Sequence, residues 1–446
     1  MSKAKAIRSV RGMGDILPAG QKQFIYQSHN WVWLREQFSR WVENRGYRYI
    51  ETPAVEEIEL FKRTSGETSD IVKKEMYLVR RSSYGEDAGA GFELCLRPEG
   101  SAGVSRAVME HGLARSQTGL KFYYISQMFR SERPQKGRYR QHTQLGVEVF
   151  RETEPAVDVE VIALLHGFYK FIGLGDTVAT INTVGDPHCR PAYREALIAF
   201  LENYKDTMSE DSRSRMYQNP MRCLDSKDPK DQELFVEAPV ILDYLNDECR
   251  DHFEEVRRGL DILGVPHNVD PRLVRGLDYY TKTAFEFKCS TLEGAIQTIG
   301  GGGRYDGLVE QIGGPPTPAI GFGTSVERIL LAMESQDLEA PRPAAPSVMV
   351  AYMDSGVKYE ALQLAEEIRS HGMAAEFLYK AKNLGKQLNE AAKKDVPFVI
   401  IIGGEEWDRG EVMLKDFRRR KQVTLPAKES CSRLMQVIEK GEIPDA

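Results

Sequence analysis

The residues between Arg130 and Arg140 are of the types that bind phosphate. Five of these eleven positions are basic, against the single acidic residue Glu132. An arginine presents a planar fork of N–H donors and keeps its charge at any ordinary pH. An arginine fixed on a strand therefore suits a phosphate, and a basic loop beside it suits a polyanion. Taken alone, the same pattern also describes a solvated loop. The five basic residues are Arg130, Arg133, Lys136, Arg138 and Arg140.

A run of four glycines, Gly300–Gly303, is a second feature that could serve chemistry. Glycine lets a backbone press against a ligand, and it also makes flexible turns, so the sequence leaves both interpretations open. Neither common nucleotide-binding signature is present. Gly385-Lys386 lacks the earlier glycine and the following Ser or Thr of a P-loop, and no G-x-G-x-x-G opens a helix.

Strand-like stretches at residues 121–127 and 145–150 flank the basic segment and predict two antiparallel strands joined by a long loop. From about 187 to 263 the chain becomes charged, with apolar residues at helical spacing, and a strand-like pattern returns at 283–288. This order predicts a helical insertion, about 186–260, within a mixed α+β domain. The two predicted apolar helix faces are Tyr193, Leu197, Phe200, Leu201 and Tyr204, and Phe253, Val256, Leu260 and Leu263.

The stretch EAPRPAAP at residues 339–346 predicts a domain boundary, because its three prolines forbid a continuous helix. Beyond it, strand-like residues 348–352 and 398–402 alternate with helical patterns, which is typical of a small α/β domain. We therefore expect a catalytic core at 1–340, a linker at 341–346 and an α/β domain at 347–446.

The composition excludes several classes of protein. With 446 residues, 41% apolar and 28% charged, the chain resembles an ordinary globular protein of two to four domains. No apolar run is long enough for a membrane helix, and no apolar signal segment is present at the N-terminus. Six scattered cysteines argue against a structural zinc site, so we expect no metal bound by cysteines or histidines and a cytoplasmic protein. The net charge of −6 weighs against indiscriminate nucleic-acid binding but permits a local basic patch.

Three motifs resemble those of the class II aminoacyl-tRNA synthetases. Phe129-Arg130-x-Glu132 resembles their motif 2. Residues 319–323, AIGFG, leading to Val326-Glu327-Arg328, resemble motif 3. The helical stretch before Gly46 and the strand that reaches Pro53 resemble motif 1, the dimer element.

Further motifs resemble one member of that class, the histidyl-tRNA synthetase family. Residues 273–280, LVRGLDYY, and 302–306, GGRYD, resemble its two histidine-specific motifs, and residues 11–18 and 96–100 fit the same family. The resemblance implies an α+β catalytic domain built on an antiparallel sheet with a helical insertion, followed by a C-terminal α/β anticodon-binding domain. It implies activation of L-histidine by ATP to histidyl-adenylate and pyrophosphate, and transfer to the 3′ end of tRNA(His). It also implies a homodimer, with Mg²⁺ bound mainly through the ATP phosphates and no zinc.

The resemblance assigns three arginines to catalysis. Arg130 would hold the α-phosphate and the carboxylate under activation, and Arg328 the γ-phosphate. Arg275 would lie against the α-phosphate as a fixed cation, and we expect it to be an exposed pocket residue. Glu132 and Arg138 would complete the ATP site.

Histidine and tRNA sites follow from the same resemblance. The α-ammonium would bind Glu99, Ser101 (where the family often has threonine) and Gln144, beside Gly100. Since neutral imidazole has one N–H donor and one lone pair, it needs an acceptor and a donor, and Glu148 and Tyr280 supply them. Tyr279 and Tyr305 would wall the pocket. Arg133, Gln135 and Arg140 would contact the tRNA acceptor end, and the basic segment 415–421 suits either a tRNA phosphate or solvent.

Two alternatives remain. The first is a synthetase-like regulatory subunit of an ATP-phosphoribosyltransferase, which charges no tRNA. That class lacks the anticodon-binding domain and erodes the catalytic motifs, whereas this chain has about 100 residues after the linker and retains Arg130, Arg275 and Arg328. The second is a nucleic-acid-binding module without chemistry, which would leave the histidine-pocket residues unexplained.

Overall fold

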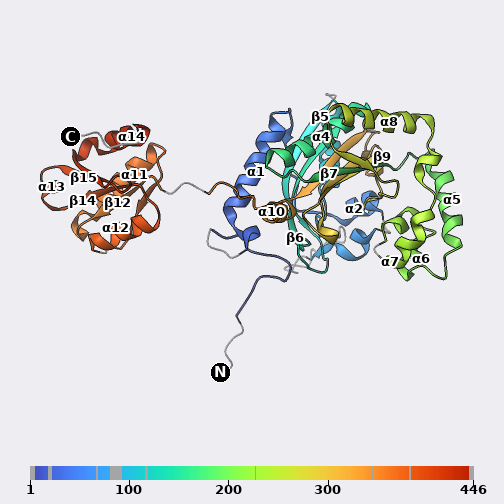
Figure 1. The fold of residues 1–446 in the computed structure, drawn as a ribbon, viewed down its shortest axis with the longest axis horizontal. Helices are drawn as coiled ribbons and strands as arrows, with labels where there is room; N and C mark the ends of the chain where they lie inside the picture. Colours follow the sequence, from blue (N-terminus) through green and yellow to red (C-terminus); the bar gives the residue numbers. More distant parts are fainter. Residues whose placement is uncertain are drawn as a thin grey trace, which may run out of the picture. The chain divides into compact units, whose positions relative to one another are not determined.

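The computed structural model describes residues 6–18, 23–66, 69–80, 93–115, 119–226, 228–342, 346–380 and 383–440. It divides into two compact units, Met1–Pro341 and Arg342–Ala446, which are coloured blue to orange and orange to red in Figure 1. Part of the expected linker, residues 343–345, lies outside the described residues. Among the described residues, no helix is long and apolar enough to cross a membrane.

An eight-stranded sheet forms the centre of the first unit. Its six central strands pair antiparallel throughout, and only the two edge strands pair parallel to their neighbours. The expected class of fold, an α+β domain on an antiparallel sheet, is confirmed. In spatial order the strands are β1 (Arg48–Tyr49), β5 (Leu120–Phe129), β6 (Gln141–Phe150), β11 (Ala319–Ser325), β10 (Thr298–Arg304), β9 (Thr281–Cys289), β7 (Thr177–Thr183) and β8 (His267–Val269).

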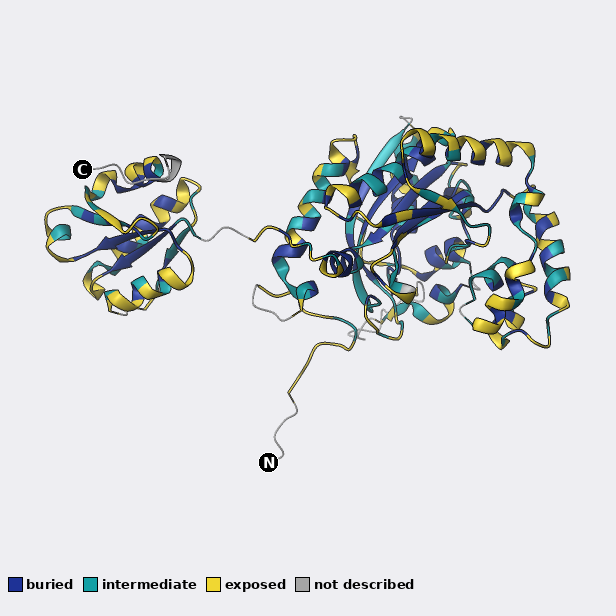
Figure 2. Cartoon of the chain, in the orientation of Figure 1, coloured by how far each residue is buried: buried dark blue, intermediate teal, exposed yellow. Residues whose placement is uncertain are grey.

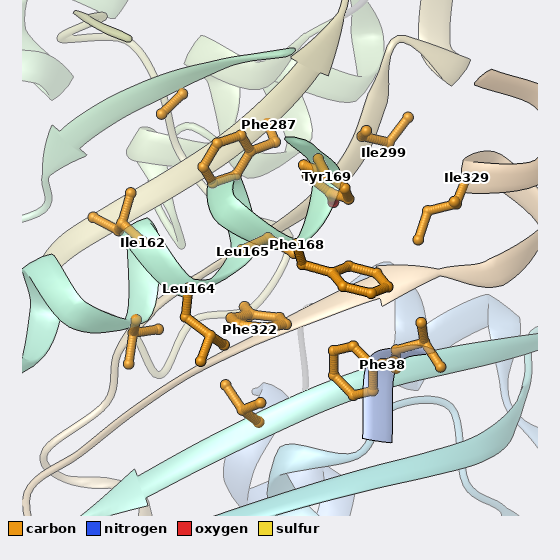
Figure 3. Packing of buried hydrophobic residues seen from close by; sticks show 14 of the residues in the cluster. Phe38, Ile162, Leu164, Leu165, Phe168, Tyr169, Phe287, Ile299, Phe322 and Ile329 are labelled. Atoms are coloured by element: carbon orange, nitrogen blue, oxygen red, sulfur yellow. The ribbon is translucent and has the colours of Figure 1, made fainter. Parts of the chain in front are cut away.

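Helices cover one face of this sheet and bury its core. Figure 3 shows the aromatic rings of Phe38, Phe168 and Phe322 gathered between the helices and the sheet, and the Phe38 and Phe168 centroids lie 5.2 Å apart in an edge-to-face arrangement. Such a pair adds roughly 0.5–1.5 kcal/mol to the burial of the rings. The covering helices are α1 (Ser28–Glu43), α4 (Pro155–Phe171), α8 (Asp247–Ile262) and α10 (Val326–Ser335).

A smaller three-stranded sheet lies in the chain between β1 and β5 of the large one, and the candidate residues Glu99, Gly100 and Ser101 follow its strand β4. Its strands occur in the order β2, β4, β3 and pair antiparallel. The element bounds are β2 (Val55–Glu57), β3 (Tyr77–Val79), β4 (Leu94–Leu96), α2 (Ile58–Ser65), α3 (Ser101–Glu110) and α9 (Leu308–Gln311).

Helices fill the region between β7 and β8, where α5, α6 and α7 lie together at one end of the unit (Figure 1). They have an apolar core of their own, which includes Tyr193, Leu197 and Leu201. One residue of the predicted helix faces is misplaced: Leu263 is 58% exposed, because α8 ends at Ile262 and the chain turns away. The bounds are α5 (Arg190–Glu202), α6 (Glu210–Arg215) and α7 (Pro229–Leu234), with a 3-10 helix at Pro220–Asp225.

The second unit is a five-stranded sheet with helices on both faces, which confirms the predicted α/β class. β12 (Val348–Tyr352) and β14 (Phe398–Ile402) are buried along their whole length, as expected of apolar strands covered on both sides (Figure 2). Its other elements are β13 (Ala375–Phe377), β15 (Glu411–Asp416), β16 (Lys421–Pro426), α11 (Lys358–Ser370), α12 (Leu384–Lys393), α13 (Gly404–Asp408) and α14 (Ser430–Lys440).

Candidate active site

Three arginines that are far apart in the sequence line one cleft of about 960 Å³ on the first unit. Arg130 directly follows β5, Arg275 lies in the loop before β9, and Arg328 is in the first turn of α10. The sheet order β5-β6-β11-β10-β9 brings these chain segments to one side of the molecule. Glu132, Arg138 and Gln144 line the same cleft.

Arg130 lies one residue beyond its strand. Its backbone N–H donates to Arg140 O at 2.9 Å and its Nε donates to Pro98 O at 2.9 Å, so backbone groups on two sides orient the guanidinium. Glu132 lies 3.5 Å from an Arg138 nitrogen and 4.0 Å from one of Arg130. Both distances leave the two guanidinium groups other donors for an anionic ligand.

Arg328 is held across the cleft by two carbonyls. Its Nε donates to Gly137 O at 3.0 Å and its Nη1 donates to Thr298 O at 2.5 Å. Burial, together with the nearby charge of Arg138, lowers the pKa of Arg328 to about 10, so it remains a cation at neutral pH. Two cations that repel each other in a shielded cleft favour the binding of an anion between them.

Arg275 forms an ion pair with Glu286 of β9, and Glu286 also accepts from Thr298 Oγ1 at 3.1 Å. The expectation that Arg275 is exposed is wrong: its side chain is only 19% exposed, because the carboxylate draws the guanidinium down onto the sheet. Glu286 was missed by the sequence reasoning. The available signal was one acidic residue between two phenylalanines, Phe285 and Phe287, in β9.

The glycine run proves to be a strand, β10, so its interpretation as a flexible turn is wrong. A Cβ added to Gly301 would lie 2.9 Å from Arg275 Nη1, and one added to Gly302 would lie 1.9 Å from Gly321 O. Since real Cβ atoms essentially never come that close, the glycines allow Arg275 and the neighbouring strand to pack against the β10 backbone.

Glu148 on β6 is the centre of a second, buried group of predicted site residues. It is fully buried and accepts from Ser101 Oγ at 2.7 Å, from Tyr124 OH at 3.4 Å and from Tyr305 OH. A Cβ on Gly321 of the adjacent strand would lie 1.8 Å from Glu148 Oε2, so the carboxylate has room only because β11 has glycine there.

Glu99 lies at the start of α3 in the same group. Its carboxylate accepts the backbone N–H groups of Ser101 at 2.7 Å and Ala102 at 2.9 Å, where a negative charge suits the positive end of a helix. The Tyr279 hydroxyl reaches it at 3.5 Å. Tyr279 also packs against Tyr280 and Tyr305, with ring centroids 4.8 and 5.6 Å away. Glu99, Gly100, Ser101, Glu148 and the three tyrosines thus form one cluster.

Tyr124 connects this cluster to the cleft, and the sequence reasoning missed it. Its hydroxyl accepts from Gln144 Nε2 at 2.7 Å and donates toward Glu148. Both Gly100 and Gly146 make room for its ring, since an added Cβ would come within 2.4 and 2.2 Å of it. The pairing of Tyr124 with Gly146 across β5 and β6 was the signal that could have found it.

The three residues expected to contact tRNA lie in the loop between β5 and β6, and they differ in exposure. Arg133 and Gln135 are exposed, whereas Arg140 is half-buried. Arg140 Nε donates to Glu132 O at 3.1 Å, and its backbone N–H donates to Gly12 O at 2.8 Å. Arg140 therefore also holds the loop against the N-terminal segment.

One histidine residue, His142, lines the cleft. Burial, with Arg130 and Arg328 nearby, lowers the pKa of His142 to about 3, so this cleft residue is neutral at physiological pH.

Among the described residues, one group has the donors for a metal ion: Asp186, Cys189 and Cys249, with ligand atoms within 4.8 Å of one another. Asp186 already accepts the N–H groups of His188 and Cys189, each at 2.9 Å, in the turn directly before α5.

The buried carboxyl of Glu148 predicts a pH-dependent stability. Burial raises its pKa to about 8, against about 4.3 in an unfolded chain. The folded state therefore keeps a proton that the unfolded chain loses, and the free energy of unfolding falls as the pH rises from about 4 to about 8. Glu148→Gln removes this ionisation, so the variant's Tm relative to wild type should be higher at pH 9 than at pH 6, by thermal melts without ligand. The surface control Glu110→Gln should show no such change, and an equal difference at both pH values would contradict the assignment.

Comparison with known proteins agrees with this geometry. Residues 25–329 match the family model described as histidyl-tRNA synthetase, and residues 347–436 match the one described as anticodon binding domain. A relative named histidine–tRNA ligase, from Desulforamulus reducens, is 44% identical over 420 residues, covering 94% of this chain and 96% of its own.

Solved structures share the fold. The apo histidyl-tRNA synthetase of Staphylococcus aureus is 33% identical, with a TM-score of 0.78, and the match covers 96% of this chain and 99% of that one. A Bacillus halodurans structure, titled ATP phosphoribosyltransferase regulatory subunit/histidyl-tRNA synthetase, matches at 22% identity with a TM-score of 0.61 over 90% of this chain and all of its own, which shows the fold alone. The family model covers most of the chain, and the curated relative matches nearly its whole length. The chain belongs to the histidyl-tRNA synthetase family.

Proposed function

We propose that this chain is a histidine–tRNA ligase that activates L-histidine with ATP and transfers it to the 3′ end of tRNA(His). The observation that carries the proposal is the arrangement of the arginine-lined cleft against the buried Glu148 cluster, joined through Gln144 and Tyr124. An anionic substrate and a small amino acid can meet at that junction.

In the activation step, the histidine carboxylate attacks the α-phosphate of ATP while pyrophosphate leaves. The enzyme forms no covalent bond to either substrate in this step. Most of the rate enhancement therefore comes from aligning the carboxylate with the α-phosphate and from neutralising the phosphate charge. Arg130 holds the α-phosphate and the reacting carboxylate, Arg275 lies against the α-phosphate, and Arg328 binds the γ-phosphate. Glu132 and Arg138, which pair with each other beside Arg130, complete the ATP site.

Histidine recognition falls to the buried cluster. Glu99, Ser101 and Gln144 accept the α-ammonium beside Gly100, and Glu148 and Tyr280 read the imidazole. Tyr279 and Tyr305 form the walls. The Tyr305 and Ser101 hydroxyls that donate to Glu148 hold its carboxyl in one orientation, which supports a role in reading a ring N–H. A polar reader of this kind rejects amino acids that lack the matching groups.

Magnesium and the dimer belong to the same proposal. Mg²⁺ prefers oxygen ligands and usually binds through substrate phosphates. Of the carboxylates that line the cleft, Glu132 and Glu286 are already paired with arginines, which fits an ion held mainly by ATP. A homodimer through the motif 1 segment is supported by the short edge strand β1, whose Tyr49 is 50% exposed.

The tRNA acceptor end approaches the loop that carries Arg133, Gln135 and Arg140. The amide of Gln135 suits a base edge and the arginines suit phosphate. In the second unit, residues 415–421 span the turn between β15 and β16, where the N–H groups of Arg418 and Arg419 donate to Asp416 Oδ1 at 2.8 and 3.1 Å. This ordered basic turn suits a phosphate near the anticodon.

Histidine-dependent exchange of labelled pyrophosphate into ATP tests the proposal. The purified chain should catalyse exchange with histidine and exceed the rate with any other amino acid by about 10³-fold or more, as expected when buried polar readers go unpaired. It should then charge bulk tRNA with labelled histidine. Arg130→Gln, purified identically, controls for a contaminating ligase. Histidine binding without exchange or charging would favour the regulatory-subunit alternative, and binding of tRNA alone would favour a module without chemistry.

A further inference from the structure

The loop that carries Arg275 has little backbone support of its own. On its N-terminal side, Leu273 N donates to Asp270 O at 2.9 Å and Leu273 O accepts from Asn182 of β7 at 3.0 Å. Within the described part of the chain, residues 274–279 make no backbone-to-backbone hydrogen bond. The position of Arg275 therefore depends on side chains that reach the loop from elsewhere.

The helical region between β7 and β8 supplies those side chains. Arg222, on the 3-10 helix Pro220–Asp225, donates from Nη2 to Gly276 O, one residue after Arg275. The same guanidinium donates from Nε to Asp278 Oδ1 at 3.1 Å, and Asn219 Nδ2 reaches that oxygen at 2.9 Å. Arg222 thus bonds the loop at two points with geometry that one planar guanidinium can satisfy.

The bond between Arg222 and Asp278 is partly shielded from water, whereas the bond to Gly276 O is exposed. The side chains of Arg222 and Asp278 are 12% and 27% exposed. On the far side of Asp278, Gly66 at the end of α2 leaves room for Oδ2, since an added Cβ would lie 2.8 Å from it. A charge-assisted bond in such surroundings is stronger than a typical exposed ion pair.

From this geometry we infer that Arg222 is a positioning residue for the activation step: it fixes the Gly276 peptide and Asp278, and thereby the place of Arg275 against the α-phosphate. The inference rests on the proposed function and deepens it, because it makes the helical region between β7 and β8 a part of the activation machinery. Arg222 would then influence histidine activation although it is not among the residues that line the cleft.

Arg222→Gln tests the inference in the full-length chain. Its kcat for histidine-dependent pyrophosphate exchange should fall by about 10–100-fold, since a misplacement of about 1 Å can cost that much. The KM for histidine should stay within about twofold, because the imidazole readers are untouched. Arg222→Lys, which keeps the charge and can bond one of the two acceptors, should be intermediate.

Arg215→Gln is the matched control. Arg215 ties the same helical region to the rest of the unit through Asp70, at 3.1 Å, without contacting the Arg275 loop. This variant should exchange within about twofold of wild type, as is usual for a partly exposed pair. If it lost as much as Arg222→Gln, general loosening of the region would explain both, and the inference would be overturned.

A double-mutant cycle with Arg275→His separates positioning from scaffolding. If Arg222 acts through Arg275, then adding Arg222→Gln to Arg275→His should lower kcat by less than about threefold further, whereas independent effects multiply. If Arg222→Gln does not fold, Asn219→Ala takes its place. This variant removes only the 2.9 Å bond from Asn219 to the Asp278 carboxylate, and its kcat should be about threefold lower than that of wild type. Full multiplication in the cycle, or wild-type exchange in the single variants, overturns the inference. Absence of exchange in wild type would instead refute the proposed function.

Discussion

Replacement of Arg275 by histidine is expected to slow the formation of histidyl-adenylate by about 10²–10³-fold, the usual cost of one preorganised donor. The guanidinium lines the phosphate cleft and Glu286 holds it there. An imidazole is shorter and mostly neutral at pH 7, so it can neither reach as far nor neutralise the developing charge. Single-turnover formation of adenylate, measured by quench-flow without tRNA, reports this step directly.

Transfer of histidine from preformed adenylate to tRNA should change far less, by under about tenfold, because the phosphate charge that Arg275 neutralises is already in place. Arg250→His is the control, since Arg250 lies on α8 and pairs with Asp247 at the surface. A modest loss of stability, about 1–3 kcal/mol, is expected, because Glu286 loses its partner in a largely buried position. Activation near the wild-type rate, or an unfolded variant, would make Arg275 a structural residue.

A fragment that ends at Pro341 should retain pyrophosphate exchange within about threefold and lose about 10²-fold or more in kcat/KM for tRNA charging. The reason is that the cleft and the Glu148 cluster lie in the first unit, whereas the family's anticodon-binding domain lies in the second. Removal of one of two linked contact sites on the same tRNA sacrifices the avidity of about 10²–10⁴ that linkage provides.

The two units have separate hydrophobic cores, which supports independent folding of the fragment. Circular dichroism and sedimentation should establish that it is folded and a dimer before activity is compared with the full-length chain. Loss of exchange from a folded, dimeric fragment would contradict the prediction, as would charging at the full-length rate.

Local patterns were sufficient for the elements that depend on neighbours in the sequence. The β5–β6 hairpin, the buried strands β12 and β14 and the buried faces of α5 and α8 follow from strand-like apolar stretches and from helical spacing, which the sequence displays directly. Leu263 is the exception, because the point at which a helix stops depends on its cap and on the following turn rather than on periodicity.

The motifs of the chain also predicted which residues bind the ATP phosphates and the histidine substrate. That prediction was possible because the arginines, carboxyls and tyrosines occur in an order that resembles a known family. Their assignment to particular ligand atoms stays a proposal. The glycine run Gly300–Gly303 shows where prediction from composition ends. Its composition permits a turn, and it is a strand because it pairs with β9 on one side and β11 on the other.

Tertiary structure alone decided three contacts that shape the candidate site. Glu286 meets Arg275, Tyr124 joins Gln144 to Glu148, and Arg222 holds the Arg275 loop. The last of these spans 54 residues of sequence. Among the cleft arginines, Arg130 and Arg275 are 145 positions apart and Arg275 and Arg328 are 53 apart. Sheet order and register determine such meetings, since a shift of one residue would turn every side chain of a strand to the opposite face. No local pattern in the sequence encodes that long-range pairing, so the sequence could name the groups that do chemistry but not the partners that hold them in place.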